Sequence, residues 1–203
     1  MRALVIVDIQ NDFLLGGALA VKEGDQVIQV VQELLQKKWD VIVASKDWHP
    51  ADHGSFATTH GKKVGDEIEL DGLEQILWPI HCVQNTKGSE FAKGWDTSKV
   101  QKIFHKGVDK NIDSYSTFFD NEHRRSTGLG DYLLENHIDE VFLAGLTTDF
   151  CVKYSALDSL SLGFKTYIIA DACRAVNLRG GDGERALLEL KKAGVLIINS
   201  KDI

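Results

Sequence analysis

Side chains that could take part in a reaction follow four short apolar segments of the chain. They are Asp8, the segment Asp47-Trp48-His49, Lys106, and the segment 145–151 that ends in Cys151. In an open parallel sheet, ligands bind outside the carboxyl ends of the strands. If the apolar segments are parallel strands, an acid, a pair of metal ligands, a lysine and a thiol therefore meet at one edge of the sheet.

Cys151 is the candidate nucleophile of this group. We predict that a helix begins near Thr148, a natural N-cap residue, so that the thiol lies in the first helical turn. There the helix dipole and free N–H groups favour the thiolate, and can lower the pKa of a cysteine from about 8.5 to roughly 3.5–7.5. Taken alone, Cys151 fits equally well as a small core residue packed on the sheet.

Asp8 and Lys106 are the candidate partners of the thiol. Asp8 follows a strand that is apolar throughout, and a buried carboxylate needs a partner because an unpaired buried charge is costly. Lys106 can supply that partner, and its cation would also favour a nearby thiolate. Together with Cys151 they provide a base, a cation and a soft nucleophile. The alternatives are a structural hydrogen-bonding role for Asp8 and an ordinary solvated lysine.

A candidate metal site comes from Asp47, His49 and His53, which fall within seven residues, and from His81 further along the chain. Asp and His two positions apart, just past a strand, can point the same way. A carboxylate with two imidazoles and open positions suits Zn²⁺, and also Fe²⁺ or Mn²⁺. His53 is either a fourth ligand, a group behind the ligands or a surface histidine. The other histidines and cysteines are expected to be structural, solvated or inert: His60, His105, His123, His137, Cys82 and Cys173.

Six apolar runs rich in β-branched residues predict strands buried on both faces of a parallel sheet: 3–7, 41–44, 100–104, 141–144, 166–170 and 195–198. Helical spacing of apolar residues occurs between several of them, at Val27, Val30, Val31, Leu34 and Leu35, then at Phe150, Tyr154 and Leu157, and at Leu187 and Leu190 after the Gly180-Gly181 breaker. The alternation predicts an α/β fold with helices on both faces of the sheet. Two long connections, 53–99 and 107–126, are expected to build a site or a lid.

The composition of the whole chain predicts one domain, residues 1–203, acting on a small molecule. The net charge of -7 argues against nucleic acid or an anionic membrane surface as partner. The apolar run 3–7 is too short for a signal peptide, and no stretch approaches the roughly 20 apolar residues of a spanning helix. Three cysteines without C-x-x-C spacing do not form a disulfide framework. We therefore expect a cytoplasmic protein and leave open whether it is a homo-oligomer.

Five sequence blocks resemble the nicotinamidases, also called pyrazinamidases, of the isochorismatase-like hydrolases. They stand in the family's order and span nearly the whole chain: VDIQNDF at 7–13, KDWHPADHGSF at 46–56, WPIHCVQNT at 78–86, FHKGVDKNIDSYSTFFDN at 104–121 and GLTTDFCVKYSALDS at 145–159. The resemblance implies a three-layer α/β sandwich around a six-stranded parallel sheet of Rossmann-like order. The implied reaction is hydrolysis of nicotinamide to nicotinate and ammonia through a cysteine thioester, in NAD salvage, with pyrazinamide as a further substrate.

The resemblance also assigns roles to individual residues. It implies a catalytic triad of Asp8, Lys106 and Cys151, and ligation of one divalent metal ion, with Zn²⁺ preferred, by Asp47, His49 and His81, with His53 as a further candidate. It implies that Phe13 and Trp78 flank the substrate ring, whose nitrogen the metal holds. It places a cis peptide at Leu146–Thr147, and backbone N–H groups of Thr147 and Cys151 as donors to the oxyanion.

Three other functions are compatible with parts of this pattern. An amidase of the same fold could act on a carbamoyl or ureido compound, or a related hydrolase on isochorismate. The Asp/His/His set weighs against these, since it implies a metal-bound heteroaromatic ring. A redox sensor built on Cys151 would explain neither that set nor Lys106. A structural zinc site is disfavoured because such sites are usually closed and rich in thiolates.

Overall fold

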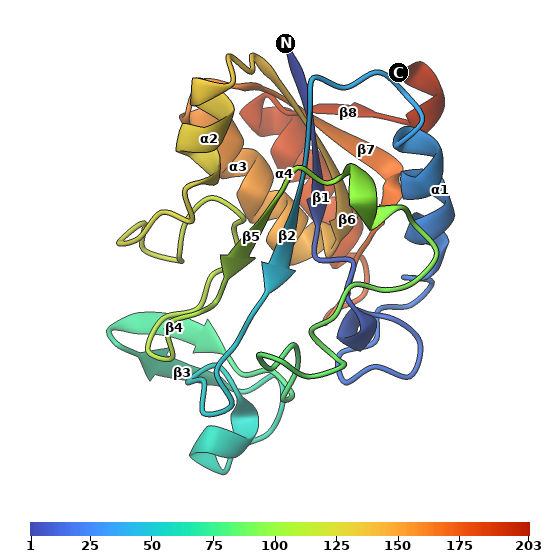
Figure 1. Ribbon diagram of the computed structural model, residues 1–203. Coiled ribbons are helices and arrows are strands. Elements are labelled where there is room, and N and C mark those ends of the chain that lie inside the picture. Colours follow the sequence, from blue (N-terminus) through green and yellow to red (C-terminus); the bar gives the residue numbers. More distant parts are fainter.

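A six-stranded parallel sheet forms the centre of the structure, a computed structural model that describes residues 1–203 (Figure 1). Its strands are β1 (Arg2–Val7), β2 (Val41–Asp47), β5 (Lys102–Lys106), β6 (Glu140–Leu146), β7 (Lys165–Arg174) and β8 (Leu196–Ile198). Their order across the sheet is β5-β2-β1-β6-β7-β8. The chain winds outward in both directions from β1 and β6, so the strand order reverses between these two strands, where α/β sheets bind ligands.

Helices cover both faces of this sheet and make three layers (Figure 1). The helices are α1 (Gln26–Leu34), α2 (Leu129–Glu135), α3 (Lys153–Ser161) and α4 (Asp182–Ala193), with short 3₁₀ turns at Asn11–Phe13, Ala57–His60, Thr97–Lys99 and Ser200–Asp202. Helix α1 packs on one face, and α2, α3 and α4 pack on the other. The predicted α/β fold with its six-stranded parallel sheet is confirmed.

Strand β1 shows why the apolar runs do not alternate with polar residues. Ala3, Val5 and Val7 belong to the core beneath α2, α3 and α4, whereas Leu4 and Ile6 belong to the core beneath α1. All five side chains are fully buried. A strand covered on both faces needs apolar residues at every position, which is the pattern that the sequence carries.

Four strands, β2, β5, β6 and β7, run further toward their carboxyl ends than the apolar runs predict. Strand β2 includes Asp47 and β5 includes Lys106, because the two residues pair across the parallel ladder. The connection 53–99 contains an unpredicted antiparallel hairpin of β3 (Glu67–Leu70) and β4 (Leu73–Ile76). Most of its residues are exposed or half-buried, so it lacks a clear apolar signal. Helix α2, of seven residues, was also not predicted.

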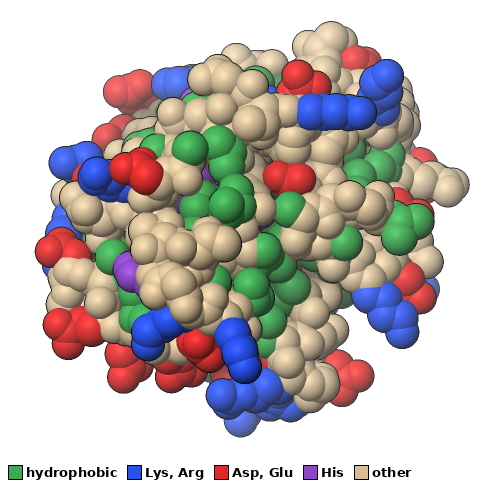
Figure 2. Space-filling model, turned by 90° about the horizontal axis from the view of Figure 1, so that it is seen from below, with side chains coloured by type: hydrophobic (Ala, Val, Ile, Leu, Met, Phe, Trp, Pro, Cys, Tyr) green, Lys and Arg blue, Asp and Glu red, His purple; other side chains and the backbone are tan.

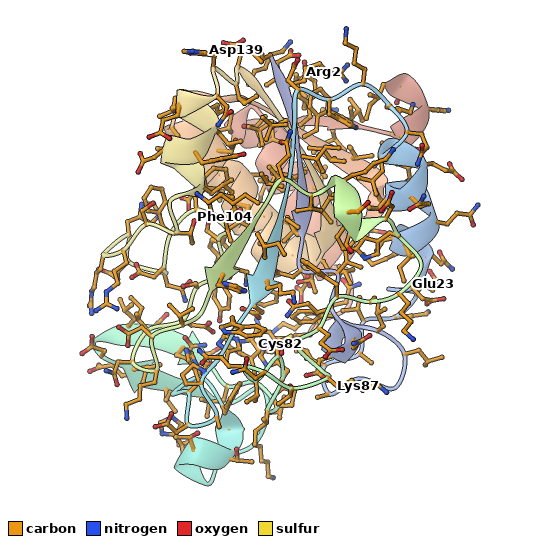
Figure 3. All side chains as sticks on the ribbon, viewed as in Figure 1. Arg2, Glu23, Cys82, Lys87, Phe104 and Asp139 are labelled. Atoms are coloured by element: carbon orange, nitrogen blue, oxygen red, sulfur yellow. The ribbon has the colours of Figure 1, made fainter.

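The long connections gather beyond the carboxyl ends of the strands, at the bottom of Figure 1. Figure 3 shows Cys82 among these loops, whereas Arg2 and Asp139 lie at the opposite end of the sheet. None of the helices has the length and apolar character needed to cross a bilayer.

Gly145 permits the close approach of β6 to β1 beside the strand-order reversal. It pairs with Val7, has φ of 128°, and a Cβ there would lie 2.1 Å from the Val7 carbonyl oxygen. Gly145→Ala is therefore expected to lower the free energy of unfolding by at least about 2–3 kcal/mol, measured by urea denaturation. The control is Gly180→Ala, where a Cβ meets no atom within 4 Å. Equal stability of the two variants would contradict this account.

Candidate active site

Lys106 lies at the centre of a buried cluster formed by the carboxyl ends of three strands and the turn after β6. Its Nζ atom is 3.0 Å from Oδ2 of Asp8 and 2.8 Å from Oδ1 of Asp47. The same nitrogen is 3.4 Å from Sγ of Cys151 and donates to the carbonyl oxygen of Ser114 at 3.0 Å. The acid, lysine and thiol expected at one sheet edge are thus in contact through a single ammonium group.

The charges of this cluster are strongly coupled. Burial lowers the pKa of Lys106, but the Asp47 and Asp8 carboxylates outweigh it and hold the pKa well above its usual value. Burial acts to raise the pKa of Asp47, yet His49 and Lys106 hold it well below its usual range. Burial raises the pKa of Asp8, and Lys106 offsets only part of that rise. Of the two carboxyl groups, Asp8 therefore has the higher pKa, which is the direction that a general acid and base requires.

The Cys151 thiol differs from the expectation of a lowered pKa. Burial raises the pKa of Cys151 well above its usual value; Lys106 lowers it, whereas Asp8 and Asp47 raise it further. Asp8 and Asp47 contact the same Lys106 ammonium group as Cys151, and their negative charges oppose the effect of the helix dipole on the thiol. In this arrangement the resting group is a thiol, which needs a base to become a nucleophile.

The turn that carries Cys151 also differs from the prediction. Residues Thr148–Val152 form a single π-helical turn before α3, and the N–H of Val152 donates to the Thr147 carbonyl oxygen at 3.0 Å. Thr147 occupies the N-cap position without a side-chain hydrogen bond, so the prediction of Thr148 as the capping residue is wrong. The peptide bond Leu146–Thr147 is cis, as the resemblance implies. The Asp149 carboxylate accepts backbone N–H groups from the loop after β7 and fixes the turn.

Asp47, His49 and His81 form a group whose donor atoms fit a divalent metal ion. Nε2 of His49 and Nε2 of His81 lie 3.2 and 3.3 Å from Oδ2 of Asp47. Nδ1 of His49 lies 3.0 Å from the carbonyl oxygen of Gly107, and Nδ1 of His81 lies 2.8 Å from that of Pro79. A carbonyl oxygen only accepts, so each Nδ1 carries the proton. Both Nε2 atoms point toward the same Asp47 carboxylate, whose charge raises the pKa of His49. A metal cation bound between them would take the place of the Nε2 protons.

His53 lies beside this group but has a different environment. Its ring centroid is 4.4 Å from that of His49, and its Nδ1 is 2.7 Å from Oγ of Ser55. Its Nε2 is buried and has no hydrogen-bond partner. Burial lowers the pKa of His53, so the ring is neutral. Its Nδ1 accepts the backbone N–H of Ser55 at 3.1 Å, which places the ring proton on Nε2, and Nε2 would have to release that proton to bind a metal ion. Together with His49 and Asp113, it makes a second set of donor atoms.

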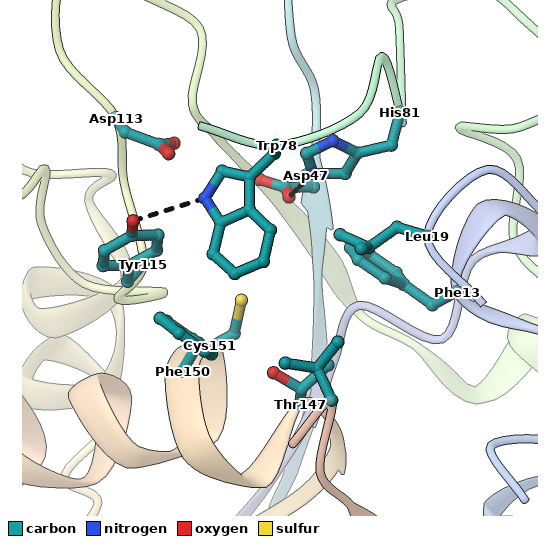
Figure 4. A pocket seen from close by; sticks show the side chains of 11 residues that line it. Phe13, Leu19, Asp47, Trp78, His81, Asp113, Tyr115, Thr147, Phe150 and Cys151 are labelled. Atoms are coloured by element: carbon teal, nitrogen blue, oxygen red, sulfur yellow. Dashed lines mark hydrogen bonds and ion pairs between the residues drawn. The ribbon is translucent and has the colours of Figure 1, made fainter. Parts of the chain in front are cut away.

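A pocket of about 30 Å³ connects the thiol with the metal-ligand group (Figure 4). Phe13 and Trp78, the two expected aromatic residues, both line it. The Cys151 sulfur points into the space below Trp78, and Asp47 and His81 lie on the far side (Figure 4). Seen from the carboxyl ends of the strands, hydrophobic side chains gather near the middle of the molecule and charged ones at the rim (Figure 2).

Sequence reasoning missed five lining residues of this pocket: Leu19, Asp113, Tyr115, Phe150 and Val176. Two of them, Asp113 and Tyr115, lie in the connection 107–126 that was expected to build a site, so their region was identified but not their roles. The Tyr115 hydroxyl accepts a hydrogen bond from Nε1 of Trp78 at 3.3 Å. Phe150 was assigned to an apolar helix face, whereas it belongs to the π-helical turn and borders the pocket.

The histidines and cysteines expected to be structural, solvated or inert lie outside this pocket. Nε2 of His60 is 2.7 Å from the Gly54 carbonyl oxygen, and Nε2 of His123 is 2.9 Å from Oδ1 of Asp158. The His105 ring packs on that of Trp48 with the two ring centroids 4.8 Å apart. Cys82, Cys151 and Cys173 are free, and burial raises the pKa of Cys82 well above its usual value and that of Cys173 to about 12.

Comparison with known proteins identifies the family of this chain. A family model, described as the isochorismatase domain, matches residues 2–202. The nicotinamidase of Escherichia coli (strain K12) is 46% identical, over 99% of this chain and 96% of its own. The solved structure of Acinetobacter baumanii nicotinamidase has a TM-score of 0.95 and 44% identity, covering 99% of this chain and 97% of that one. The pyrazinamidase of Pyrococcus horikoshii, solved in complex with zinc, has a TM-score of 0.80 and 36% identity, covering 98% of each chain.

The chain belongs to the isochorismatase family of α/β hydrolases. Within that family it belongs to the nicotinamidase and pyrazinamidase group, because its full-length relatives carry those names at high identity. The resemblance identified from the five sequence blocks is confirmed.

Proposed function

We propose that this protein is a nicotinamidase, which hydrolyses nicotinamide to nicotinate and ammonia through a thioester on Cys151. The observation that carries the proposal is the contact of one buried ammonium group, Lys106, with Asp8, Asp47 and the Cys151 sulfur. Asp47 and Cys151 in turn line a small aromatic pocket. The full-length similarity to the E. coli nicotinamidase supports the substrate. The chain is thus an amidohydrolase that serves NAD salvage, and we extend the proposal to pyrazinamide as a substrate.

In the acylation step the substrate ring lies between Phe13 and Trp78, with its carboxamide over Cys151. Asp8 accepts the thiol proton, and Lys106 stays charged and offsets the negative charge that develops on sulfur. The sulfur attacks the amide carbon, while backbone N–H groups of Thr147 and Cys151 donate to the oxyanion; loss of one such donor typically costs about 10²–10³ in rate. Asp8 returns its proton to the departing nitrogen, so that ammonia leaves and a thioester remains.

In the second half-reaction, water replaces ammonia. Asp8, again a carboxylate, takes a proton from a water molecule whose oxygen attacks the thioester carbon. The same backbone N–H groups stabilise the second oxyanion, and the thiol leaves with the proton from Asp8. The products are nicotinate and the original thiol. One carboxyl group therefore acts as base and then as acid in each half-reaction, which fits the raised pKa of Asp8.

Asp47, His49 and His81 would hold one divalent metal ion, with His53 as a further candidate ligand. When bound, the ion supplies a Lewis acid that holds the ring nitrogen and selects heteroaromatic amides. We propose Zn²⁺ as the ion, because a carboxylate with two imidazoles suits zinc and the related P. horikoshii enzyme was solved with it; Fe²⁺ and Mn²⁺ suit the same donors.

His49→Ala is expected to lower metal retention by at least about tenfold and to raise KM, because it removes an imidazole nitrogen from the donor set. The measurements are metal content by mass spectrometry after dialysis, and ammonia-release kinetics. The matched control is His105→Ala, whose ring packs on Trp48 away from the pocket. Metal content equal to that of the wild type would remove His49 from the ligand set.

The function itself is tested by measuring ammonia release from nicotinamide, pyrazinamide and a set of carbamoyl and ureido compounds, before and after chelation. We expect release from the two heteroaromatic amides and its loss on chelation. A preference for the carbamoyl or ureido compounds would instead make this a related amidase of the same fold. We place the reaction in the cytoplasm, where three buried free cysteines stay reduced.

A further inference from the structure

A second hollow, here called the outer groove, lies beside the pocket that Cys151 lines. Its volume is about 490 Å³, compared with about 30 Å³ for the catalytic pocket. The groove runs between the hairpin region, which contributes Val64 and Ile76, and the helical layer, which contributes Tyr154. Leu178, from the loop before α4, also lines it. The outer groove is therefore larger than the pocket that contains Cys151.

Phe150 is the one side chain that lines both the catalytic pocket and the outer groove. Its ring meets that of Trp78 at 4.9 Å, edge to face at 88°, and that of Tyr115 at 5.3 Å. Phe150 also directly precedes Cys151 in the π-helical turn, so its position relative to the sulfur is fixed by the backbone. The ring therefore forms a wall between the two spaces, held by two aromatic neighbours.

The lining of the outer groove combines aliphatic side chains with charged side chains of both signs. Val64, Ile76 and Leu178 supply aliphatic surface. Lys153 pairs with Glu189 and Arg185 pairs with Asp182. The remaining charged lining residues are Glu67, Asp149 and Arg179. Because acidic and basic side chains nearly balance around the groove, neither an anion nor a cation is strongly favoured there, whereas the aliphatic surface stabilises an aryl or alkyl group.

We propose that Phe150 sets the upper size limit of the substrate by closing the catalytic pocket from the outer groove. Without the Phe150 ring, the groove takes an aryl or alkyl substituent of an aromatic amide whose carboxamide lies at Cys151. The inference rests on the proposed function, since it uses the amide position over the sulfur. It makes Phe150 a specificity-determining residue of the same reaction.

The test compares nicotinamide with nicotinamides that carry a phenyl group on ring carbon 5 or 6. For the wild type we expect kcat/KM for both phenyl amides below about 1% of that for nicotinamide. Phe150→Ala should raise the ratio for at least one of them by at least about tenfold. Phe150→Tyr, which keeps the ring, should keep the wild-type selectivity, and Phe150→Leu provides a second test if the alanine variant is unstable.

A groove-filling substitution distinguishes the groove from the space left by the ring itself. In the double variant Phe150→Ala, Leu178→Trp, the new indole narrows the groove, and the gain for the phenyl amide should disappear. A gain that survives Leu178→Trp would show that the groove is not used. No gain in folded Phe150→Ala or Phe150→Leu would show that Phe150 is not the wall.

Binding measurements separate this inference from the proposed function. Calorimetry with Cys151→Ala, and with Cys151→Ala combined with Phe150→Ala, reports the affinity for each amide without turnover. Phenyl amides should bind at least about tenfold more tightly when the Phe150 ring is absent. If phenyl amides bind more tightly without the Phe150 ring while the wild type releases no ammonia from nicotinamide, the proposed function is wrong. In that case Phe150 still separates the pocket from the groove. Equal affinity for the phenyl amides with and without the ring would show that Phe150 does not separate the two spaces.

Discussion

Replacing Cys151 with alanine is expected to lower kcat for nicotinamide by roughly 10⁴-fold or more, while the protein still folds and binds metal and substrate. The substitution removes the only sulfur that lines the catalytic pocket and that contacts Lys106 at 3.4 Å. Asp8 and the backbone N–H groups remain, but they have no attacking atom to act on. The measurements are ammonia release for turnover and calorimetry for substrate binding.

The control for this substitution is Cys173→Ala, which also removes a buried thiol but lies outside the pocket. It should retain nearly full activity, although its stability falls by about 1 kcal/mol from the small cavity. Activity of Cys151→Ala within about tenfold of the wild type would exclude the thioester route. Intact-mass analysis during turnover adds an independent readout, because a nicotinoyl adduct should appear on the wild type alone. Only oxidised forms of Cys151 would favour the redox-sensor alternative.

An element of the fold was predictable from sequence when burial sets the hydrophobic pattern of its residues. Strand β1 is apolar at each position because both of its faces are covered, and α1 buries Val27, Val31 and Leu34 at helical spacing. The hairpin of β3 and β4 was not predictable on the same grounds. Glu67 and Glu69 are exposed, and its other residues are mostly half-buried, so no apolar run indicates it.

The candidate site was predictable where topology alone brings residues together. Asp8, Asp47 and Lys106 each lie at or just after the end of a parallel strand, so the sheet places them at one edge. The electrostatics were not predictable in the same way. The pKa of Cys151 depends on buried carboxylates that reach it across long sequence separations, and local helix geometry carries no information on them.

The remaining pocket residues come from loops whose course has no periodic signal. Leu19 follows β1, Tyr115 lies in the connection after β5, and Val176 follows β7. Only the packing of these three loops against one another makes them neighbours, and a single sequence does not specify that packing. Their chemistry is also unremarkable by type, because an isolated Leu or Val is far more often a core or surface residue than part of a substrate pocket.

Lys106→Met is expected to lose both activity and stability, because Lys106 is the shared counter-ion of two buried carboxylates. Its side chain is 1% exposed, that of Asp8 is 0% exposed and that of Asp47 is 7% exposed. Without the ammonium group Asp8 stays buried and loses its ion pair, whereas Asp47 keeps only His49 and His81 as partners. Breaking a buried ion pair by removing one partner typically costs about 3–5 kcal/mol. We expect a loss of that size in urea denaturation of the metal-free protein, and a fall in kcat of at least about 10³-fold.

The matched control is Lys102→Met on the same strand, where the lysine is exposed and the change in stability should stay within about 0.5 kcal/mol. The double variant Lys106→Met, Asp8→Asn identifies the cause of the loss. Asparagine removes the carboxylate that Lys106→Met leaves without an ion pair. The double variant should therefore be more stable than Lys106→Met alone, although it has neither base nor cation and stays inactive. If Asp8→Asn brings no recovery, the stability of this cluster does not come from charge pairing, and the role of Lys106 in supporting Asp8 as the base loses its physical basis.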